Sequence, residues 1–385
     1  MIMKINNKYL PSVVFFGALL VCMPAYSESL TAGEDHTCLL NSNGAAYCWG
    51  DNSVGQLGNR STEPSMVPVA VSGNLRFDSI STSWDHTCGV TREGNAYCWG
   101  RGRYGRLGNG MSEHSTVPVA VSGGLTFESV SAGLAHTCGV TTDGSAFCWG
   151  LNEDGILGNN SVETSAIPVA VAGALSFGSI RAGSATTCGI TKIGDAYCWG
   201  SGDFGRLLGQ GPNDRGNKMS PGLVAGDFKF KPDSLSVGLD HACAISTDEK
   251  AVCWGRGRYG KLGIGLGDGL GVIDNLMTPR EINGNISFAL ITTGVFQTCG
   301  IASDNASYCW GRNGSGQLGD GTTVMRVEPA VISTDQTFTA ITIGNDHACG
   351  VAVNKDIYCW GDGNAGKLGN LTSDNRLTPT KVAAN

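Results

Sequence analysis

Seven cysteine pairs with one spacing dominate this 385-residue sequence. In each pair a Cys is followed, ten positions later, by a Cys-Trp-Gly triplet, and the pairs use fourteen of the fifteen cysteines. Self-similarity with a period of about 50 residues is typical of stacked or circularly arranged units. The sequence therefore indicates a repeat architecture. The pairs are Cys38 with Cys48, Cys88 with Cys98, Cys138 with Cys148, Cys188 with Cys198, Cys243 with Cys253, Cys299 with Cys309, and Cys349 with Cys359.

The second copy predicts how each pair is arranged. Two β-rich runs flank residues 92–94, and a turn there, with Gly94 at positive φ, makes a β-hairpin. In that register Cys88 faces Cys98, and directly opposed residues of antiparallel strands lie within reach of a disulfide. We therefore expect one intra-hairpin disulfide in each of the seven units.

Side-chain alternation predicts the next level of structure. Tyr97 and Trp99 point to the face opposite Cys98, so both faces of the sheet carry side chains of a buried type. A sheet covered on both faces by its neighbours is a propeller blade. With about four strands per unit, the chain is predicted to be an all-β, seven-bladed β-propeller. Because residues 28–33 and 379–382 resemble complementary parts of one unit, we expect the two ends to share a split unit.

The N-terminal segment predicts export. Residues 1–27 have the basic start, apolar stretch and small-residue site of a signal peptide, with cleavage after Ser27. Residues 28–385 would then form a single propeller domain in a secreted or periplasmic, disulfide-forming setting. The net charge of −7 argues against nucleic acid as a partner, and no segment is long and apolar enough for a membrane span. We expect a monomer.

Five of the six histidines occupy one position of the repeat. A ring of imidazoles could bind metal, but each lies in a separate unit, so structural hydrogen bonding is the preferred interpretation. An Asp precedes four of them, yet adjacent strand residues point to opposite faces, which prevents an Asp-His dyad within one strand. The sequence predicts no catalytic, metal or cofactor site. The five histidines are His36, His86, His136, His241 and His347.

Two features break the repeat symmetry. The Trp-Gly motifs are spaced by 50, 50, 50, 55, 56 and 50 residues, which places insertions at Leu208–Leu223 and Ile264–Arg280. Insertions of this kind map to loops on one face, often the binding face, although neutral drift would give the same pattern. Cations and tyrosines also cluster near these turns, as in interface hot spots or in a solvated rim. The candidate partner-binding residues are Arg101, Arg103, Tyr104, Arg215, Lys218, Arg256, Arg258 and Tyr259.

The repeat resembles that of the regulator-of-chromosome-condensation family. The resemblance extends over residues 28–385 and implies a seven-bladed propeller. The family includes a nuclear exchange factor for a small GTPase, and a secreted bacterial branch, similar to β-lactamase inhibitory proteins, grips a partner protein with one face of the ring. In the third unit the matching residues are His136-Thr137-Cys138, Gly144, Phe147-Cys148-Trp149-Gly150 and Gly155-Ile156-Leu157-Gly158.

Three functions remain open at this point. The preferred one is a secreted or periplasmic, non-catalytic scaffold that binds a protein or a cell-surface polymer through loops on one propeller face. The second is a guanine-nucleotide exchange factor, which requires a cytosol that contains small GTPases. The third is a channel-mouth hydrolase or lyase, which requires acids or histidines that converge at the mouth of the central channel.

Overall fold

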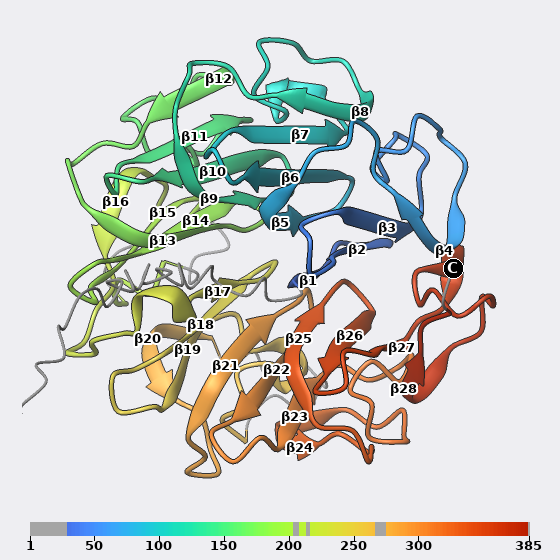
Figure 1. Cartoon of the computed structure of the whole chain (residues 1–385). Helices are drawn as coiled ribbons and strands as arrows, with labels where there is room; N and C mark the ends of the chain where they lie inside the picture. Colours follow the sequence, from blue (N-terminus) through green and yellow to red (C-terminus); the bar gives the residue numbers. More distant parts are fainter. Residues whose placement is uncertain (1–28, 203–207, 213–215, 266–274, 384–385) are drawn as a thin grey trace, which may run out of the picture.

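The computed structural model describes residues 29–202, 208–212, 216–265 and 275–383. These residues form seven four-stranded antiparallel sheets, which are arranged as blades around a central axis (Figure 1). The chain is therefore a seven-bladed β-propeller, as predicted. Each blade consists of four strands that are consecutive in the sequence, with the first strand nearest the axis. The blades are numbered 1 to 7 in chain order, so that blade 1 holds β1–β4 and blade 7 holds β25–β28. The predicted signal peptide, residues 1–27, lies outside the described residues.

The strands have nearly the same bounds in every blade. The innermost strands are β1 (Ser29–Ala32), β5 (Phe77–Thr82), β9 (Phe127–Ala132), β13 (Phe177–Ala182), β17 (Ser236–Val237), β21 (Phe288–Thr293) and β25 (Phe338–Ile343). The second strands are β2 (His36–Leu40), β6 (His86–Thr91), β10 (His136–Thr141), β14 (Thr186–Thr191), β18 (His241–Ile245), β22 (Gln297–Ala302) and β26 (His347–Ala352).

The outer half of each blade follows the same plan. The third strands are β3 (Ala46–Gly50), β7 (Ala96–Gly100), β11 (Ala146–Gly150), β15 (Ala196–Gly200), β19 (Ala251–Gly255), β23 (Ser307–Gly311) and β27 (Ile357–Gly361). The outermost strands are β4 (Ser65–Ala70), β8 (Ser115–Ala120), β12 (Ser165–Ala170), β16 (Lys218–Leu223), β20 (Leu276–Glu281), β24 (Arg326–Val331) and β28 (Arg376–Lys381). Short 3-10 helices are η1 (Arg103–Gly105), η2 (Pro232–Ser234), η3 (Arg258–Gly260) and η4 (Asn364–Gly366).

All seven predicted disulfides are present. Each joins the second and third strands of one blade, and the two Cα atoms of each pair are 4.0 to 4.1 Å apart. Gly94 has a φ of 79° in the hairpin turn of blade 2, as its place in the sequence predicted. A bridge between directly opposed residues fixes the hairpin register of every blade. The bridges join Cys38 to Cys48, Cys88 to Cys98, Cys138 to Cys148, Cys188 to Cys198, Cys243 to Cys253, Cys299 to Cys309, and Cys349 to Cys359.

The hydrophobic core lies between the blades. Each Trp of the Cys-Trp-Gly triplet is fully buried and packs against the preceding blade, as Trp149 of blade 3 packs against Val90 and Leu107 of blade 2. The indole Nε1 of Trp149 donates to the backbone oxygen of Arg106 at 2.9 Å. Gly108 allows this approach, since a Cβ there would lie 2.6 Å from Nε1. Each Trp therefore joins two blades.

The ring closes differently from the prediction. Every blade is built from consecutive strands, so the expectation that the two chain ends share a split unit was wrong. Blade 1 instead packs side by side on blade 7, where Trp49 Nε1 donates to the Lys367 oxygen at 2.9 Å and β1 contacts β25. The ends of the repeat fall between blades, so side-chain packing rather than a shared strand closes the ring.

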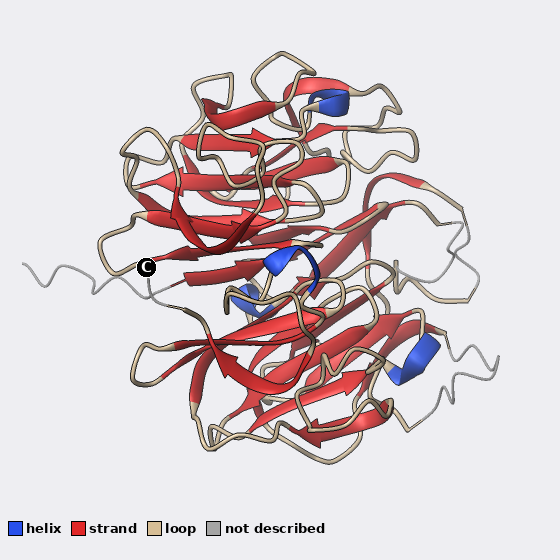
Figure 2. Ribbon diagram, turned by 90° about the vertical axis from the view of Figure 1, so that its right-hand side faces the viewer, coloured by secondary structure: helices blue, strands red, loops and turns tan. Residues whose placement is uncertain are grey.

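The strand order defines two faces. Strands run from one face of the ring to the other, and loops gather on both sides (Figure 2). The long-loop face carries the turns from first to second strands and the loops from third to fourth strands. The hairpin face carries the other two kinds of connection. Within one blade the two parts of the long-loop face are bonded together, as Arg101 N donates to the Asp85 oxygen at 2.8 Å.

Candidate partner-binding face

The five histidines link neighbouring blades. Each imidazole is fully buried, and its Nε2 lies 2.8 to 3.0 Å from the hydroxyl of a Thr in the next blade. The last of these pairs joins His347 to Thr37 and so closes the ring. Structural hydrogen bonding, the preferred interpretation of these residues, is confirmed. The pairs are His36–Thr87, His86–Thr137, His136–Thr187, His241–Thr298 and His347–Thr37.

The hydrogen-bond chain assigns the proton of each imidazole. The Thr137 hydroxyl donates its single proton to the Arg106 oxygen at 2.9 Å, so it accepts from His86 Nε2. The same chain recurs at the other four pairs. Each histidine therefore carries a proton on Nε2. Its buried Nδ1 has no hydrogen-bond partner among the described residues, as expected for a neutral ring. Burial lowers the pKa of His36 to about 4 and that of His136 to about 3.

The two blades that lack the histidine show matched changes. Blade 5 has Ala242 at the position of the Thr acceptor, and blade 4, which precedes it, has Thr186 at the position of the His donor. Blade 7 has Ala348 at the acceptor position, and the preceding blade has Gln297, whose Nε2 donates to the Asn345 oxygen at 2.9 Å. Where the Thr acceptor is replaced in one blade, the His donor of the preceding blade is therefore replaced as well.

Buried cations hold the bases of three long loops. Arg106 Nη1 lies 3.1 Å from Asp85 Oδ1, and Lys261 pairs with Asp240. Burial lowers the pKa of Arg106 and of Lys261, and in each case the carboxylate opposes the shift. Lys367 of blade 7 pairs with Asp362 of its own loop at 2.5 Å and also reaches Asp35 of blade 1, at 2.6 Å. These cations are engaged within the protein and are not free for a ligand.

The first predicted cluster lies on the long-loop face of blade 2. Arg103 and Tyr104 belong to η1, and the Arg103 guanidinium lies 4.6 Å from the centre of the Tyr104 ring. Tyr104 has a φ of 65°, and Arg101 Nη1 pairs with Asp85 Oδ2 at 2.8 Å while 41% of its side chain stays exposed. The cluster places guanidinium groups and an aromatic ring side by side on this face.

The second predicted cluster lies on the same face of blade 5. The Arg258 guanidinium lies 4.7 Å from the Tyr259 ring centre, and Arg256 pairs with Asp240 at 3.6 Å. The structure adds two residues of blade 6 that sequence reasoning missed. Phe296 meets Tyr259 edge to face with 5.4 Å between ring centres, and Arg312 lies 5.4 Å from the Phe296 ring centre. Only the fold brings this blade 6 pair beside blade 5.

The two clusters share a face but do not form one patch. Blades 3 and 4 separate them along the ring in one direction, and blades 6, 7 and 1 in the other. Lys218 begins β16 at the end of the blade 4 loop, opposite Gly200. Arg215 lies outside the described residues, as do residues 203–207, 213–214 and 266–274 of these loops.

The insertions alter the long-loop face at neighbouring blades. The loop from third to fourth strand covers residues 101–114 in blade 2, but residues 201–217 in blade 4 and 256–275 in blade 5. The extra residues between Trp199 and Trp254 lie in two places: in the loop of residues 201–217 and in the segment with η2 that precedes β17. Apolar side chains are also exposed on the other long loops, and they are Met111, Val162, Val324 and Leu371.

The mouth of the central channel opens on this same face. It is a pocket of about 110 Å³, lined by the residue at one turn position of every blade. At the positions directly before and after it in the turn, most blades carry the same residue type, whereas the residue at this position varies from blade to blade. A comparison of the repeats could therefore have found it, although sequence reasoning passed over it. The seven residues are Glu34, Trp84, Leu134, Ser184, Leu239, Val295 and Asn345.

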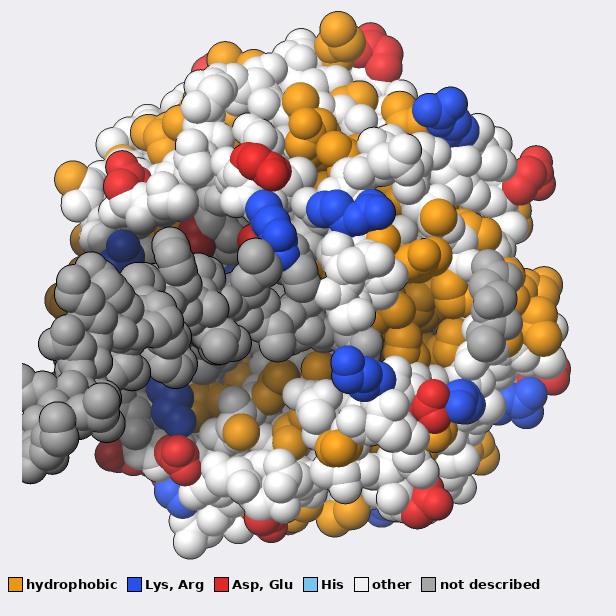
Figure 3. All heavy atoms as spheres, in the orientation of Figure 1, with side chains coloured by type: hydrophobic (Ala, Val, Ile, Leu, Met, Phe, Trp, Pro, Cys, Tyr) orange, Lys and Arg blue, Asp and Glu red, His pale blue; other side chains and the backbone are white. Residues whose placement is uncertain are grey.

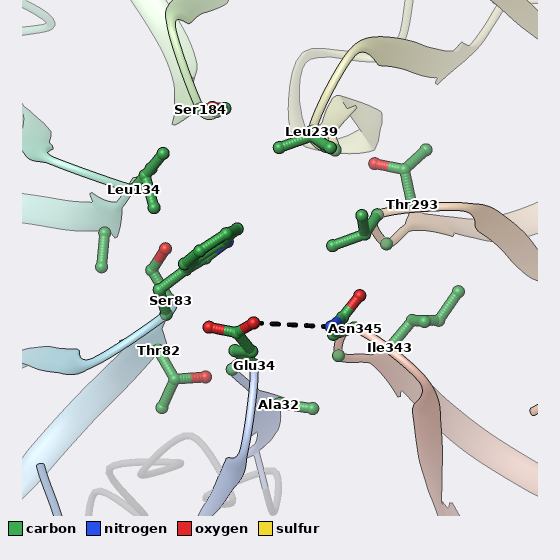
Figure 4. A pocket seen from close by; sticks show the side chains of 18 of the residues that line it. Ala32, Glu34, Thr82, Ser83, Leu134, Ser184, Leu239, Thr293, Ile343 and Asn345 are labelled. Atoms are coloured by element: carbon green, nitrogen blue, oxygen red, sulfur yellow. Dashed lines mark hydrogen bonds between the residues drawn. The ribbon is translucent and has the colours of Figure 1, made fainter. Parts of the chain in front are cut away.

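Glu34 is the acidic member of this ring. Asn345 Nδ2 donates to its Oε1 at 3.5 Å, and the two side chains point toward one another at the mouth (Figure 4). Burial, and then the nearby carboxylates of Asp35 and Asp85, raise the pKa of Glu34 to about 7. Asp35 and Asp85 are paired with Lys367 and Arg106, so Glu34 is the carboxyl of the mouth without a cationic partner among the described residues.

Two other classes of site are absent from the part of the chain that the structure describes. No group of three or more His, Cys, Asp or Glu side chains there could hold a metal ion. No helix of the described chain is long and apolar enough to cross a membrane. On the face shown in Figure 3, Lys and Arg side chains occur in small groups interspersed with Asp and Glu, outside the grey atoms.

The repeat identifies the family. A model of the regulator of chromosome condensation (RCC1) repeat matches residues 28–56, 77–106, 127–156, 179–206, 233–261 and 338–367. A second model of the same repeat matches residues 43–90, 93–140, 143–190 and 304–351. The chain belongs to the RCC1 repeat family. The match includes the third unit and confirms the resemblance seen there.

Similar proteins support the fold. Human HERC2, an E3 ubiquitin-protein ligase, is 30% identical over 137 residues, which are 35% of this chain and 3% of HERC2. The chain thus spans a small part of that relative's length. Prp20p of Saccharomyces cerevisiae is 20% identical, with a TM-score of 0.77 over 94% of this chain and 88% of its own. Human WBSCR16 is 19% identical, with a TM-score of 0.76 over 88% and 94%.

Proposed function

We propose that this protein is a secreted or periplasmic, non-catalytic scaffold that recognises a protein or cell-surface partner through its long-loop face. The observation that carries the proposal is the gathering of the irregular features on that face. Both Arg-Tyr clusters, both lengthened loops and the variable channel mouth lie there. In repeat proteins the residues that depart from the repeat without stabilising it are the usual means of recognition.

The chemistry of the face fits a protein partner. Arg and Tyr are enriched at the hot spots of protein interfaces, and Met is enriched at interfaces in general. Tyr104 and Tyr259 each pack against an Arg guanidinium, 4.6 and 4.7 Å from the ring centre, and side chains that already pack together lose less entropy on binding. The similar fold of yeast Prp20p, a protein with binding properties toward Gsp1p and histones, is consistent with such a use.

The disulfides and the channel mouth argue against the two alternative functions, an exchange factor for a small GTPase and a channel-mouth hydrolase or lyase. Seven disulfides favour an oxidising compartment over the cytosol that a small-GTPase exchange factor requires. A hydrolase needs a nucleophile or a second acid beside Glu34, but Asp35 and Asp85 are engaged with cations. The histidines lie between blades rather than at the mouth.

The test of this function begins with isolation of a partner from the envelope and surroundings of the producing organism. The ranges predicted from the sequence, 208–223 and 264–280, include strands β16 and β20, so only the loops that precede these strands, residues 201–217 and 256–275, are then shortened to the length found in blade 3. Loop shortening changes closure entropy slowly, so folding should persist, while partner affinity should fall about tenfold or more. Titration measures affinity, and circular dichroism checks folding.

A matched control lies on the opposite face. Ile193, with 75% of its surface exposed in a hairpin turn, is changed to Ser, and partner affinity should not change. If the shortened protein binds as well as the full chain while Ile193→Ser weakens binding, the hairpin face is the binding face. Export is tested separately by N-terminal sequencing of protein recovered outside the cytoplasm, which should begin at Glu28.

A further inference from the structure

The channel has a second chamber toward the hairpin face. It has a volume of about 440 Å³ and is lined by the innermost strands and η2. One register position, opposite the first Cys of each disulfide, carries a hydroxyl in six blades. These residues are Thr31, Ser81, Ser131, Ser236, Thr292 and Thr342. In blade 4 the same position is Arg181, opposite Cys188.

The hydroxyls have a structural task that Arg181 does not perform. At five of the seven junctions the hydroxyl accepts a hydrogen bond from a backbone N–H of the adjacent innermost strand, as Ser81 Oγ accepts from Ala132 N at 3.0 Å. A guanidinium has no acceptor, so Arg181 gives up this link to blade 5. The substitution also brings a charge into a confined space, which costs free energy.

The Arg181 guanidinium has few close polar contacts. Arg181 Nη1 donates to the Ile180 oxygen at 2.9 Å, and no ion pair to Arg181 lies within 4.0 Å among the described residues. Burial lowers the pKa of Arg181 and Asp233 opposes the shift, but the group remains a cation. Arg181 and Asp233 are the only charged residues among the described residues that line the chamber.

The local backbone is adapted to this arrangement. η2 replaces the start of the innermost strand in blade 5 and brings Asp233 to the chamber. It packs closely on β13, where Ser179 Oγ donates to the Pro232 oxygen. Gly178 makes room, since a Cβ there would lie 2.7 Å from the Pro232 Cβ. Other blades carry larger residues at that position, so the junction of blades 4 and 5 is specialised on this side too.

We propose that this chamber binds an organic monocarboxylate, with Arg181 as the group that holds the carboxylate. Guanidinium and carboxylate form two parallel hydrogen bonds, and the hydroxyl of Ser131 in the adjacent blade still has its proton to donate. Arg181 is the one cation among the described lining residues, and the Asp233 carboxylate opposes each further negative charge, so a monoanion is favoured over a dianion such as phosphate. The volume lies within the range of small-molecule pockets. Residues that break a repeat at a cost in stability are typical of functional sites.

The experiment uses the whole mature protein with butyrate as the probe. Calorimetric titration should detect butyrate binding, and thermal melts should shift upward with butyrate. Arg181→Ser restores the residue of blades 2 and 3. It should weaken binding about tenfold or more, as expected for loss of a charged hydrogen-bonding partner. Without butyrate it should melt at the same temperature as the wild type or higher, because it removes a confined charge and regains a hydrogen bond. Arg181→Lys should bind with intermediate affinity.

The control is Arg76→Ser. The Arg76 guanidinium also donates to the oxygen of the preceding residue, at 3.1 Å, but lies on the exposed exterior. This variant should bind butyrate like the wild type. The proposal is overturned if Arg181→Ser melts several degrees earlier, which would make Arg181 a structural residue. It is also overturned if that variant keeps its butyrate affinity, or if inorganic phosphate binds as well as butyrate.

A second arm separates two sources of the carboxylate. Glutamate with its amino and α-carboxyl groups blocked presents one side-chain carboxylate, as a peptide would. Arg181-dependent binding of butyrate alone assigns a free organic acid. Arg181-dependent binding of blocked glutamate in preference to butyrate assigns an acidic side chain of a polypeptide.

Discussion

The junction between blades 2 and 3 and the junction between blades 4 and 5 differ at two strand registers and at the Trp. Trp149 Nε1 donates to the Arg106 oxygen, whereas Trp254 Nε1 is buried without a hydrogen-bond partner among the described residues. At the first junction, His86 pairs with Thr137 at 3.0 Å and Ser81 accepts from Ala132 N at the same distance. At the second junction, Thr186 stands at the position of His86, Ala242 at that of Thr137, and Arg181 at that of Ser81. The Thr186 hydroxyl is buried without a hydrogen-bond partner among the described residues.

This difference distinguishes the contacts that close the ring from the irregular features that the ring carries on its surface and in its channel. The packing of the Trp side chain recurs at every junction, so it belongs to closure. The His–Thr and hydroxyl–amide links are both missing between blades 6 and 7, where Gln297 bonds to the Asn345 oxygen instead, and between blades 4 and 5, where no described contact replaces them at these positions. The junction between blades 4 and 5 carries the lengthened loops on one face and Arg181 with η2 on the other. The irregular features therefore collect at the junction where no described contact replaces the missing polar links.

The largest expected effect is acid unfolding. The five histidines are neutral in the folded state, with a pKa near 4 for His36 against 6.5 when unfolded. Protonation therefore favours the unfolded chain. Their stabilisation is complete above about pH 6.5 and is lost as the pH falls toward 4. By then His36 alone costs about 3 kcal/mol. Denaturant unfolding with disulfides intact, from pH 8 to pH 4, measures it. A flat profile would contradict neutral, buried imidazoles.

Next comes the contact common to all junctions. Trp149→Ala should lower the free energy of unfolding by about 3–5 kcal/mol, because a large, fully buried side chain leaves a cavity between blades 2 and 3. Trp254→Ala should cost a similar amount at the irregular junction. Met111→Ala, at an exposed loop residue, is the control for chemical denaturation. A much smaller cost for Trp254 would show that the junctions differ in packing as well.

The His–Thr hydrogen bond of a regular junction can be replaced by the Thr–Ala pair found between blades 4 and 5. Thr187→Ala removes the acceptor of His136 and should cost about 1–3 kcal/mol, since a buried donor is left unsatisfied. Adding His136→Thr reproduces the pair found between blades 4 and 5. The double variant should be more stable than Thr187→Ala alone in the same denaturation assay. Additive losses would mean that the matched changes in the repeat carry no energetic coupling.

The smallest effect concerns the channel mouth. Glu34 has a folded pKa of about 7 against 4.5 unfolded, so its ionisation destabilises the fold as the pH rises from 4.5 through 7. Glu34→Gln should therefore stabilise the protein at pH 8 by about 1 kcal/mol, after allowance for solvent screening of a half-buried group, and not at pH 4.5. Ser184→Ala, at the equivalent position of blade 4, should show no pH dependence. Thermal melts at both pH values compare them.

Much of the fold could be predicted from one unit. The spacing of Cys88 and Cys98, the glycine between them and the alternation around Trp99 determine the hairpin, its disulfide and its two buried faces. The candidate residues Arg101 to Tyr104 and Arg256 to Tyr259 were found because they interrupt a regular pattern. Their roles in partner binding stay predictions until a partner is isolated.

Other features required the ring itself. The sequence by itself determined what each blade is, because strand alternation, turn glycines and disulfide register act within about 25 residues. Only the tertiary structure decided how blade 7 meets blade 1, that Phe296 joins Tyr259, and that Arg181 and Glu34 face opposite ends of one channel. These are contacts between residues far apart in the chain. Their distances depend on how seven sheets pack around an axis, and no local pattern encodes that geometry.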